Sequence, residues 1–247
     1  MKLNILRWNN NTTKLLLLHL ISHIGVVYSF FVGELWMFIA AFIWWQFVAA
    51  TSIASGYHRF YSHHSFKTGK WYEHYVNIVG MFANPGPVFT WASVHRQHHR
   101  HTDKEKDPHS YVHKGWFPVY FNTWGWFTQI EKKFALPYFR DKTVMFYYKN
   151  YFKIICAMCV VLFLIDPLLF VFGWCWTAFL AFHGYGIINI LGHRGGRPRN
   201  SAIANILTAG EGWHEYHHKK AMDWKNGDKW WQWDFAGVWI RLIKYSS

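Results

Sequence analysis

The chain has 247 residues, of which 52% are hydrophobic and 21% aromatic, while only 16% are charged. Ordinary soluble domains carry about 25% charged residues, so this composition argues against a soluble globule and against a disordered or fibrous chain. Lysine and arginine total 26 against 13 acidic residues, giving a net charge of +13, and there are 17 histidines besides. Such a basic balance is typical of proteins that bind nucleic acid or an anionic membrane surface.

Four apolar runs are long enough to cross a bilayer, which takes about 20 residues. They are residues 15–33, 35–55, 147–165 and 167–192. Only Glu34 separates the first two and only Asp166 the last two, so the runs predict two helical hairpins. No small-residue cleavage site follows the first run, which favours a retained helix over a signal peptide. The apolar stretch 75–94 is broken by Asn84-Pro85-Gly86-Pro87, which favours a re-entrant or interfacial segment over a fifth span.

The basic residues are confined to three segments: 3 lie in residues 1–14, 14 in residues 58–153 and 9 in residues 193–247. The two hairpin turns carry acidic residues instead, so the positive-inside rule predicts that both termini and the long loop are cytoplasmic. We therefore predict an all-α integral membrane protein with one domain over residues 1–247. Its four transmembrane helices would carry a cytoplasmic helical cap, made of residues 56–146 and 193–247. Because the charge follows this topology, nucleic-acid binding is not expected.

Nine of the histidines occur in three short boxes and one isolated position. They are His58, His63, His95, His98, His99, His193, His214, His217 and His218. In the two H-x-x-H-H boxes, positions i, i+3 and i+4 share one helical face, so the three rings of each box are expected to converge on one point. Asn189 and His193 also face the same way. His58 and His63 are about 140° apart on an ideal helix and need a helix end or a wrapped geometry to converge.

Nine imidazoles exceed the four ligands of one zinc ion but suffice for two metal ions with open positions. Neutral imidazole suits iron, zinc, copper and nickel. The other histidines are expected to be ordinary core or surface residues, although His101 and His109 could orient the ligands. This group comprises His19, His23, His64, His74, His101, His109, His113 and His183.

Three other interpretations fit the histidines less well. His214-Glu215-x-x-His218 matches the H-E-x-x-H motif of zinc metalloproteases, but a protease would leave the first two boxes unexplained. The Glu-x-x-His pairs of ferritin-like di-iron bundles lie on different helices, whereas those at Glu211 and Glu215 overlap in one segment. A metal carrier or transporter would need ligands inside the membrane, not at its surface.

These motifs resemble the membrane fatty acid desaturases with three histidine boxes, over about residues 56–239. H-R-F-Y-S-H at His58 is similar to the family's H-R-x-x-S-H, and Asn189 with His193 resembles the N-x-x-x-H element of its stearoyl, Δ9 branch. The resemblance implies two iron ions, Fe2+ or Fe3+, held by the nine histidines, with Asn189 holding one through water and no other catalytic residue. It also implies an O2-dependent reaction that leaves a cis double bond, at Δ9, in an acyl chain. A hydroxylase or related oxygenase on the same scaffold is the alternative.

A desaturase of this kind must hold its acyl chain in an apolar tunnel that excludes water. Phe89, Trp91 and Trp213 are our candidates for lining it. Trp91-Ala92-Ser93-Val94 replaces the Trp-Ala-Arg-Asp of acyl-CoA members, which favours an acyl lipid or acyl-carrier-protein substrate over acyl-CoA. Glu215 stands where the family often has Asn or His. No His-Pro-Gly-Gly haem motif is present, so we expect a separate electron carrier of the ferredoxin or cytochrome type, besides the membrane lipids.

Overall fold

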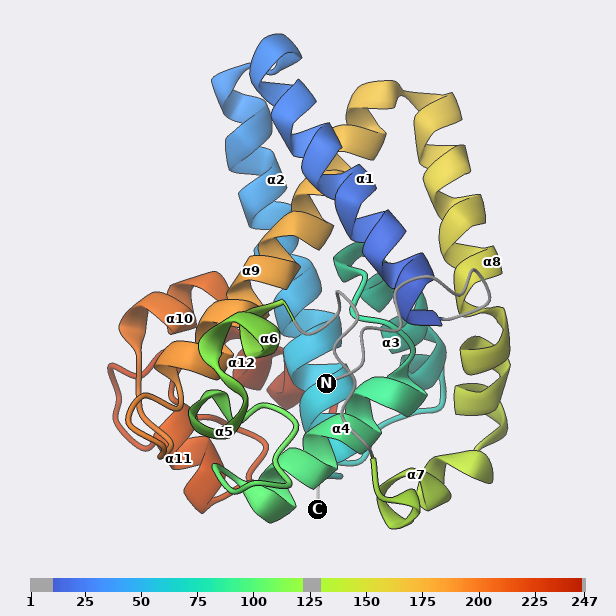
Figure 1. Ribbon diagram of the computed structural model, residues 1–247. Helices are drawn as coiled ribbons and strands as arrows, with labels where there is room; N and C mark the ends of the chain where they lie inside the picture. Colours follow the sequence, from blue (N-terminus) through green and yellow to red (C-terminus); the bar gives the residue numbers. More distant parts are fainter. Residues whose placement is uncertain (1–10, 122–129, 246–247) are drawn as a thin grey trace.

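The computed structural model describes residues 11–121 and 130–245. Two helical hairpins project side by side from a more compact base (Figure 1). The first hairpin consists of α1 (Asn11–Val32) and α2 (Leu35–Val48), which continues as the π-helix η1 (Ala49–Ser62). The second consists of α8 (Lys142–Ile165) and the π-helix η4 (Leu169–Cys175), which continues as α9 (Trp176–Leu191).

These four helices are long and apolar enough to cross a membrane, over Asn11–Val32, Leu35–Ser62, Lys142–Ile165 and Leu169–Leu191. The predicted hairpins are therefore confirmed, but several of the helices begin or end at other residues than predicted. The second helix runs on to Ser62, and the third begins at Lys142, where the Asp141 carboxylate accepts a hydrogen bond of 3.0 Å from the Val144 N–H. Hydropathy misses both stretches because the helices continue with polar residues once they enter the base.

The outer surfaces of the hairpins are apolar. The side chains of Phe31 on α1 and Leu164 on α8 are 82% and 76% exposed. Exposed apolar residues on this scale mark a surface that meets lipid and not water. At the turn of the second hairpin, the Asp166 carboxylate accepts the Leu168 N–H at 2.8 Å, which starts the returning helix.

Short helices build the base below the hairpins (Figure 1). They are α3 (Trp71–Gly80), the 3-10 turn η2 (Met81–Ala83), α4 (Val88–His101), α5 (Tyr111–Lys114), α6 (Trp116–Tyr120), α7 (Lys132–Phe139), α10 (Ala202–Leu207), α11 (His214–Lys219) and α12 (Phe235–Ile243). Within residues 11–121 and 130–245 the only strand-like pairing is a single bridge between Asn200 and Trp213. The all-α fold is thus confirmed. The stretch 75–94 is not one of the four spans, and it breaks at Asn84, whose backbone is left-handed with φ of 49°.

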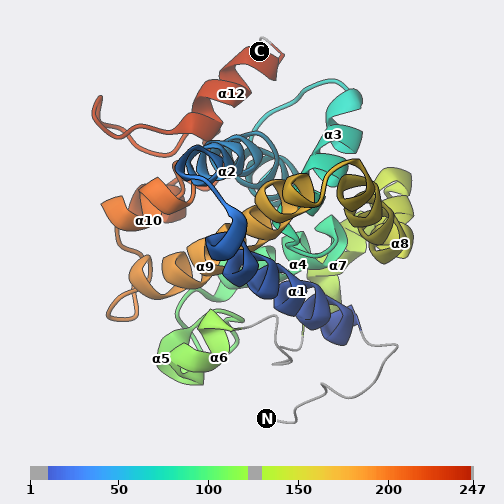
Figure 2. The same cartoon turned by 90° about the horizontal axis from the view of Figure 1, so that it is seen from above.

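The core of the base surrounds η1, which packs against α3, α4 and α12. Seen from above, α2 lies between α9 on one side and α3 and α12 on the other (Figure 2). Ile53, Tyr57 and Arg59 of η1 are all fully buried. A buried arginine is rare unless it is paired, so the polar partners of η1 point to the functional site.

Candidate metal centre and its cavity

The π-helix η1 brings His58 and His63 together. In a π-helix each N–H bonds five residues back, and the His63 N–H accordingly donates to the His58 carbonyl at 3.2 Å. Residues five apart then lie one above the other, and the two rings are 4.9 Å apart between centroids. The expected divergence of 140° therefore does not arise, because it assumed an α-helix.

The nine histidines of the boxes converge, in two groups. One group contains His58, His63, His95, His99 and His217, and the other contains His98, His193, His214 and His218. Within each group the ligand nitrogens all lie within 4.8 Å of one another. Either group could hold a metal ion.

The expectation that each H-x-x-H-H box converges on one point was wrong. His95 and His99 of α4 face the first group, whereas His98 faces the second. In α11 the pattern is reversed, since His214 and His218 face the second group and His217 the first. Positions i and i+4 are 40° apart on a helix while i+3 lies on the other side of i. Each box can therefore serve both groups.

Buried carboxylates fix the orientation of three rings. The Nδ1 atom of His98 lies 2.8 Å from Asp107, that of His193 lies 3.0 Å from Asp103, and that of His58 contacts Glu211. Desolvation raises the pKa of Asp107, but its interactions with His98 and then His109 outweigh this and lower the pKa to about 2. Such an ionised carboxylate only accepts hydrogen bonds. When Nδ1 of such a ring donates its proton to the carboxylate, Nε2 is the nitrogen that the neutral ring can offer to a metal.

The arrangement of these lone pairs fits bound cations. The Nε2 atom of His58 lies 2.9 Å from Nε2 of His217, and that of His193 lies 2.8 Å from Nε2 of His214. Burial, and then the neighbouring histidines, holds the pKa of His214 and His217 well below the usual range, so these rings are neutral as ligands must be. Imidazole binds metals such as zinc at about 2.0–2.1 Å. Neutral rings whose unprotonated nitrogens face one another repel. A metal ion bound between the nitrogens of each group would remove this repulsion.

A buried ion-pair network stands behind the first group. Arg59 donates to Glu211 at 2.7 Å and to both carboxylate oxygens of Asp234 at 2.7 and 2.9 Å. Desolvation raises the pKa of Glu211, but His58 and Arg59 outweigh this effect and lower it below the usual value. The network links the first box, the third box and the start of α12, where Asp234 also accepts the Gly237 N–H.

Sequence reasoning missed these supporting carboxylates, although the motifs held a signal. Asp103 and Asp107 follow the second box in H-T-D-x-x-x-D, and Glu211 precedes the third box. Of the two histidines proposed as supports, His109 donates its backbone N–H to Asp107 at 2.8 Å. His101 instead pairs with Glu131, 3.3 Å away, and does not hold a ligand.

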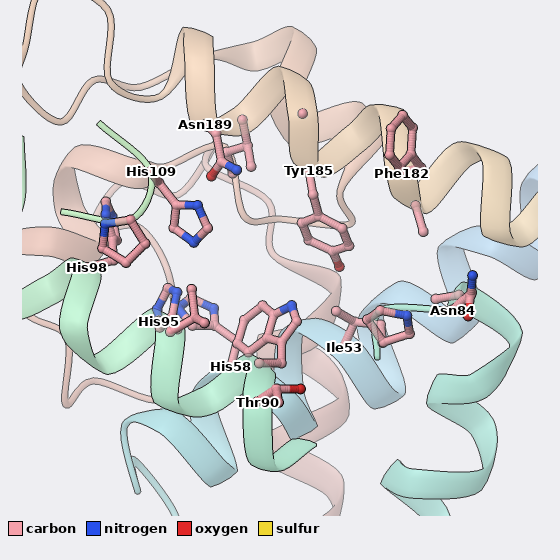
Figure 3. A pocket seen from close by; sticks show the side chains of 18 of the residues that line it. Ile53, His58, Asn84, Thr90, His95, His98, His109, Phe182, Tyr185 and Asn189 are labelled. Atoms are coloured by element: carbon pink, nitrogen blue, oxygen red, sulfur yellow. The ribbon is translucent and has the colours of Figure 1, made fainter. Parts of the chain in front are cut away.

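A cavity of about 400 Å³ extends from the two groups. His98, His109 and Asn189 lie at one end of it, and Phe182 and Asn84 at the other (Figure 3). Apolar residues of η1 and α9, among them Ile53, make up much of the wall between.

Of the three tunnel candidates, only Trp91 lines this cavity. Phe89 is two residues away on α4, which turns it by about 200°, and its ring packs on Phe139 and Tyr148. Trp213 packs edge-on against Trp231 and donates its indole N–H to the Trp233 carbonyl at 2.8 Å. Neither ring lines this cavity, because both pack into the surrounding core.

No family model matches the chain. Among curated proteins, the chain is 30% identical to the sn-1 stearoyl-lipid 9-desaturase of Synechocystis, over 92% of this chain and 74% of that protein. It is 30% identical to the sn-2 palmitoyl-lipid 9-desaturase of a Nostoc strain, over 89% of this chain and 84% of that protein. The chain belongs to the membrane fatty acid desaturase family. It is also 33% identical to an acyl-CoA C20 Δ5-desaturase of Anemone leveillei, over 76% of this chain and 65% of that protein.

The desaturase is therefore an oxidoreductase and a membrane protein, as the histidine boxes and apolar runs indicated. The zinc protease interpretation is not favoured. Its general base would be Glu215, but this side chain is exposed and pairs with Lys219 at 2.7 Å.

Proposed function

We propose that this desaturase binds two iron ions and introduces a cis double bond at Δ9 into the acyl chain of a membrane lipid. The observation that carries the proposal is the convergence of nine histidine rings in two groups at one end of an apolar cavity. The relatives named stearoyl-lipid and palmitoyl-lipid 9-desaturases support the position of the double bond and the class of substrate.

In this proposal His58, His63, His95, His99 and His217 hold one iron, and His98, His193, His214 and His218 hold the other. Asn189 lines the cavity at the end of the second group, which has one imidazole fewer, and would hold its iron through water. When bound, the iron pair supplies O2 activation and the removal of two hydrogens from an unactivated CH2–CH2 unit, which no side chain can perform. Glu211, Asp103 and Asp107 keep the ligand rings oriented.

The remaining residues position the chain and exclude water. The cavity has an apolar wall made by Ile53, Ala54, Ala181 and Ile188. This wall excludes water, which would otherwise cause side reactions. Ser93, buried on α4, replaces the arginine of acyl-CoA members, which favours an acyl lipid. Electrons would come from a separate ferredoxin or cytochrome-type carrier, attracted to a basic cytoplasmic cap.

Expression in a host that lacks desaturase activity, followed by lipid analysis, tests this function. The wild-type chain is expected to produce a new cis-Δ9 alkene and to copurify with about two iron atoms. His98→Ala is expected to abolish the alkene, whereas His113→Ala, at an exposed histidine of α5, keeps it. Hydroxylated lipid without alkene would indicate the oxygenase instead, and an alkene made by His98→Ala would overturn the assignment of the site.

A further inference from the structure

The end of the cavity farthest from the metal ligands is polar, although it lies among membrane-spanning helices. His19 of α1 lines this cavity and is only 2% exposed, and Asn84 is fully buried at its end (Figure 3). Among the described residues, neither ring nitrogen of His19 has a hydrogen-bond partner, and neither has the amide nitrogen of Asn84. Leaving such buried groups unsatisfied costs about 1–3 kcal/mol each. A ligand that accepts hydrogen bonds here would remove this cost.

The neighbouring histidines of the membrane region, His23 and His183, already have hydrogen-bond partners, and the donors and acceptors among them can be assigned. The Nδ1 atom of His23 lies 2.6 Å from the His19 carbonyl, so it must donate, and its Nε2 accepts from Nε2 of His183 at 3.2 Å. Nδ1 of His183 then accepts from the Tyr120 hydroxyl at 2.8 Å. This chain of bonds uses the His19 backbone but leaves the His19 ring for the cavity.

The amide of Asn84 is also oriented. The Gly86 N–H donates to the Tyr151 hydroxyl at 3.1 Å, and that hydroxyl in turn lies 3.4 Å from Oδ1 of Asn84. Because the hydroxyl accepts from Gly86, its own proton points to Oδ1, and the NH2 group of Asn84 is left over as a donor. α1 lies against this segment, since a Cβ on Gly86 would be 3.4 Å from Leu15, one helical turn before His19.

The residues that line the cavity indicate that its ligand is uncharged at this end. The described residues that line the cavity include neither lysine nor arginine. A carboxylate or phosphate bound there would be a buried anion without a cation, which is strongly unfavourable. An uncharged oxygen that accepts hydrogen bonds from neutral donors meets no such cost.

We propose that His19 and Asn84 bind the carbonyl oxygen of the substrate's acyl ester while the same acyl chain reaches the histidine groups. The inference deepens the proposed function and rests on it. An ester carbonyl is uncharged, accepts hydrogen bonds only and is joined to the apolar chain that the rest of the cavity suits. The site therefore selects esters over free fatty acids, and it holds the carbonyl at one end of the cavity while carbons farther along the chain lie at the other.

The test compares a stearoyl glycerolipid with its octadecyl ether analogue, in which CH2 replaces the carbonyl, and with free stearate. For purified wild-type enzyme we expect the KM of the ester to be at least about five- to tenfold below that of the ether, which is the effect of one neutral hydrogen bond, because the ether loses the bonds from both donors. His19→Leu should raise the KM for the ester toward that of the ether, because only the Asn84 bond remains, with little change in kcat and in iron content. Asn84→Gly, which tolerates the left-handed backbone, should act in the same direction. His113→Leu is the matched control and should keep the preference.

A second measurement needs no turnover. The infrared band of a ¹³C-carbonyl ester is expected at lower frequency when bound to the wild-type enzyme than in lipid, and to return in His19→Leu. An unchanged band together with an unchanged ester preference in both variants would overturn the inference. Failure of the wild type to make any alkene would instead contradict the proposed function, and the infrared measurement would still decide whether this site binds the carbonyl.

Discussion

Two glutamates four residues apart occupy opposite environments beside the third histidine box. Glu211 is 5% exposed and contacts His58 and Arg59, whereas the side chain of Glu215 is 43% exposed and pairs with Lys219. One therefore belongs to the support of the metal ligands and the other to the solvated face of α11. The sequence alone places both next to His214 and in Glu-x-x-His pairs, and it does not tell which of them supports the histidines.

We predict that Glu211→Gln lowers metal affinity about 10- to 100-fold, as is usual when a partner of a ligand histidine is lost. It should also destabilise the fold by about 3 kcal/mol, because Arg59 loses one of its two buried counter-ions. Iron content after dialysis and thermal unfolding in detergent measure the two effects. Glu215→Gln is the matched control and should keep iron and alkene production. A loss of iron and of alkene production in Glu215→Gln, but not in Glu211→Gln, would contradict these two roles.

At the scale of elements, η1 decides where the first histidine box lies. It packs so closely against α3 that position 56 must be glycine. A Cβ at Gly56 would be 2.4 and 2.6 Å from the two methyl carbons of Val76. The sequence predicted that the spanning helix ends at residue 55 and that the box belongs to the polar cap, since hydropathy falls there. The π-helical continuation could not be foreseen, because it depends on burial against α3, α4 and α12 and not on any local pattern.

Gly56→Ala is therefore expected to destabilise the desaturase by about 1–3 kcal/mol, the usual cost of overpacking a core. Because His58 follows two residues later, iron content should fall as well. Val76→Ala in the same chain should restore much of both, since it removes the clashing methyl groups. Gly173→Ala in η4, where the nearest atom would be 3.6 Å away, is the control and should unfold at nearly the wild-type temperature. Equal melting temperatures for Gly56→Ala and Gly173→Ala would contradict this account.

At the scale of the whole molecule, the sequence predicted the architecture well because long apolar runs and acidic turns need no tertiary information. The nine histidines could be proposed as ligands for the same reason, since most of them lie in short motifs that can be recognised without the fold. Their division between two groups could not, because it depends on how α4 and α11 face each other. Asp103 and Asp107 could have been suspected from their place after the second box, but their partners, Nδ1 of His193 and of His98, are known only from the fold.

The orientation in the membrane is the largest prediction that still depends on charge alone. The hairpin turns at Glu34 and Asp166 lie at the opposite end of the molecule from the base that carries the histidines (Figure 1). The basic residues outside the spans flank that base, and the positive-inside rule places them in the cytoplasm. The histidine groups would then face the compartment that holds a soluble electron carrier.

Single cysteines at two exposed glutamates test the orientation. Glu34→Cys lies in the first turn and Glu105→Cys in the base, each in a chain whose native Cys156, Cys159 and Cys175 are replaced by alanine. A membrane-impermeant maleimide is expected to label Glu34→Cys in intact cells and Glu105→Cys only after permeabilisation. The opposite pattern would mean that the 26 basic residues do not set the topology, and that electrons reach the site from the other side of the membrane. Because both cysteines replace solvent-exposed glutamates, neither should change iron content, so a difference in labelling reports orientation and not misfolding.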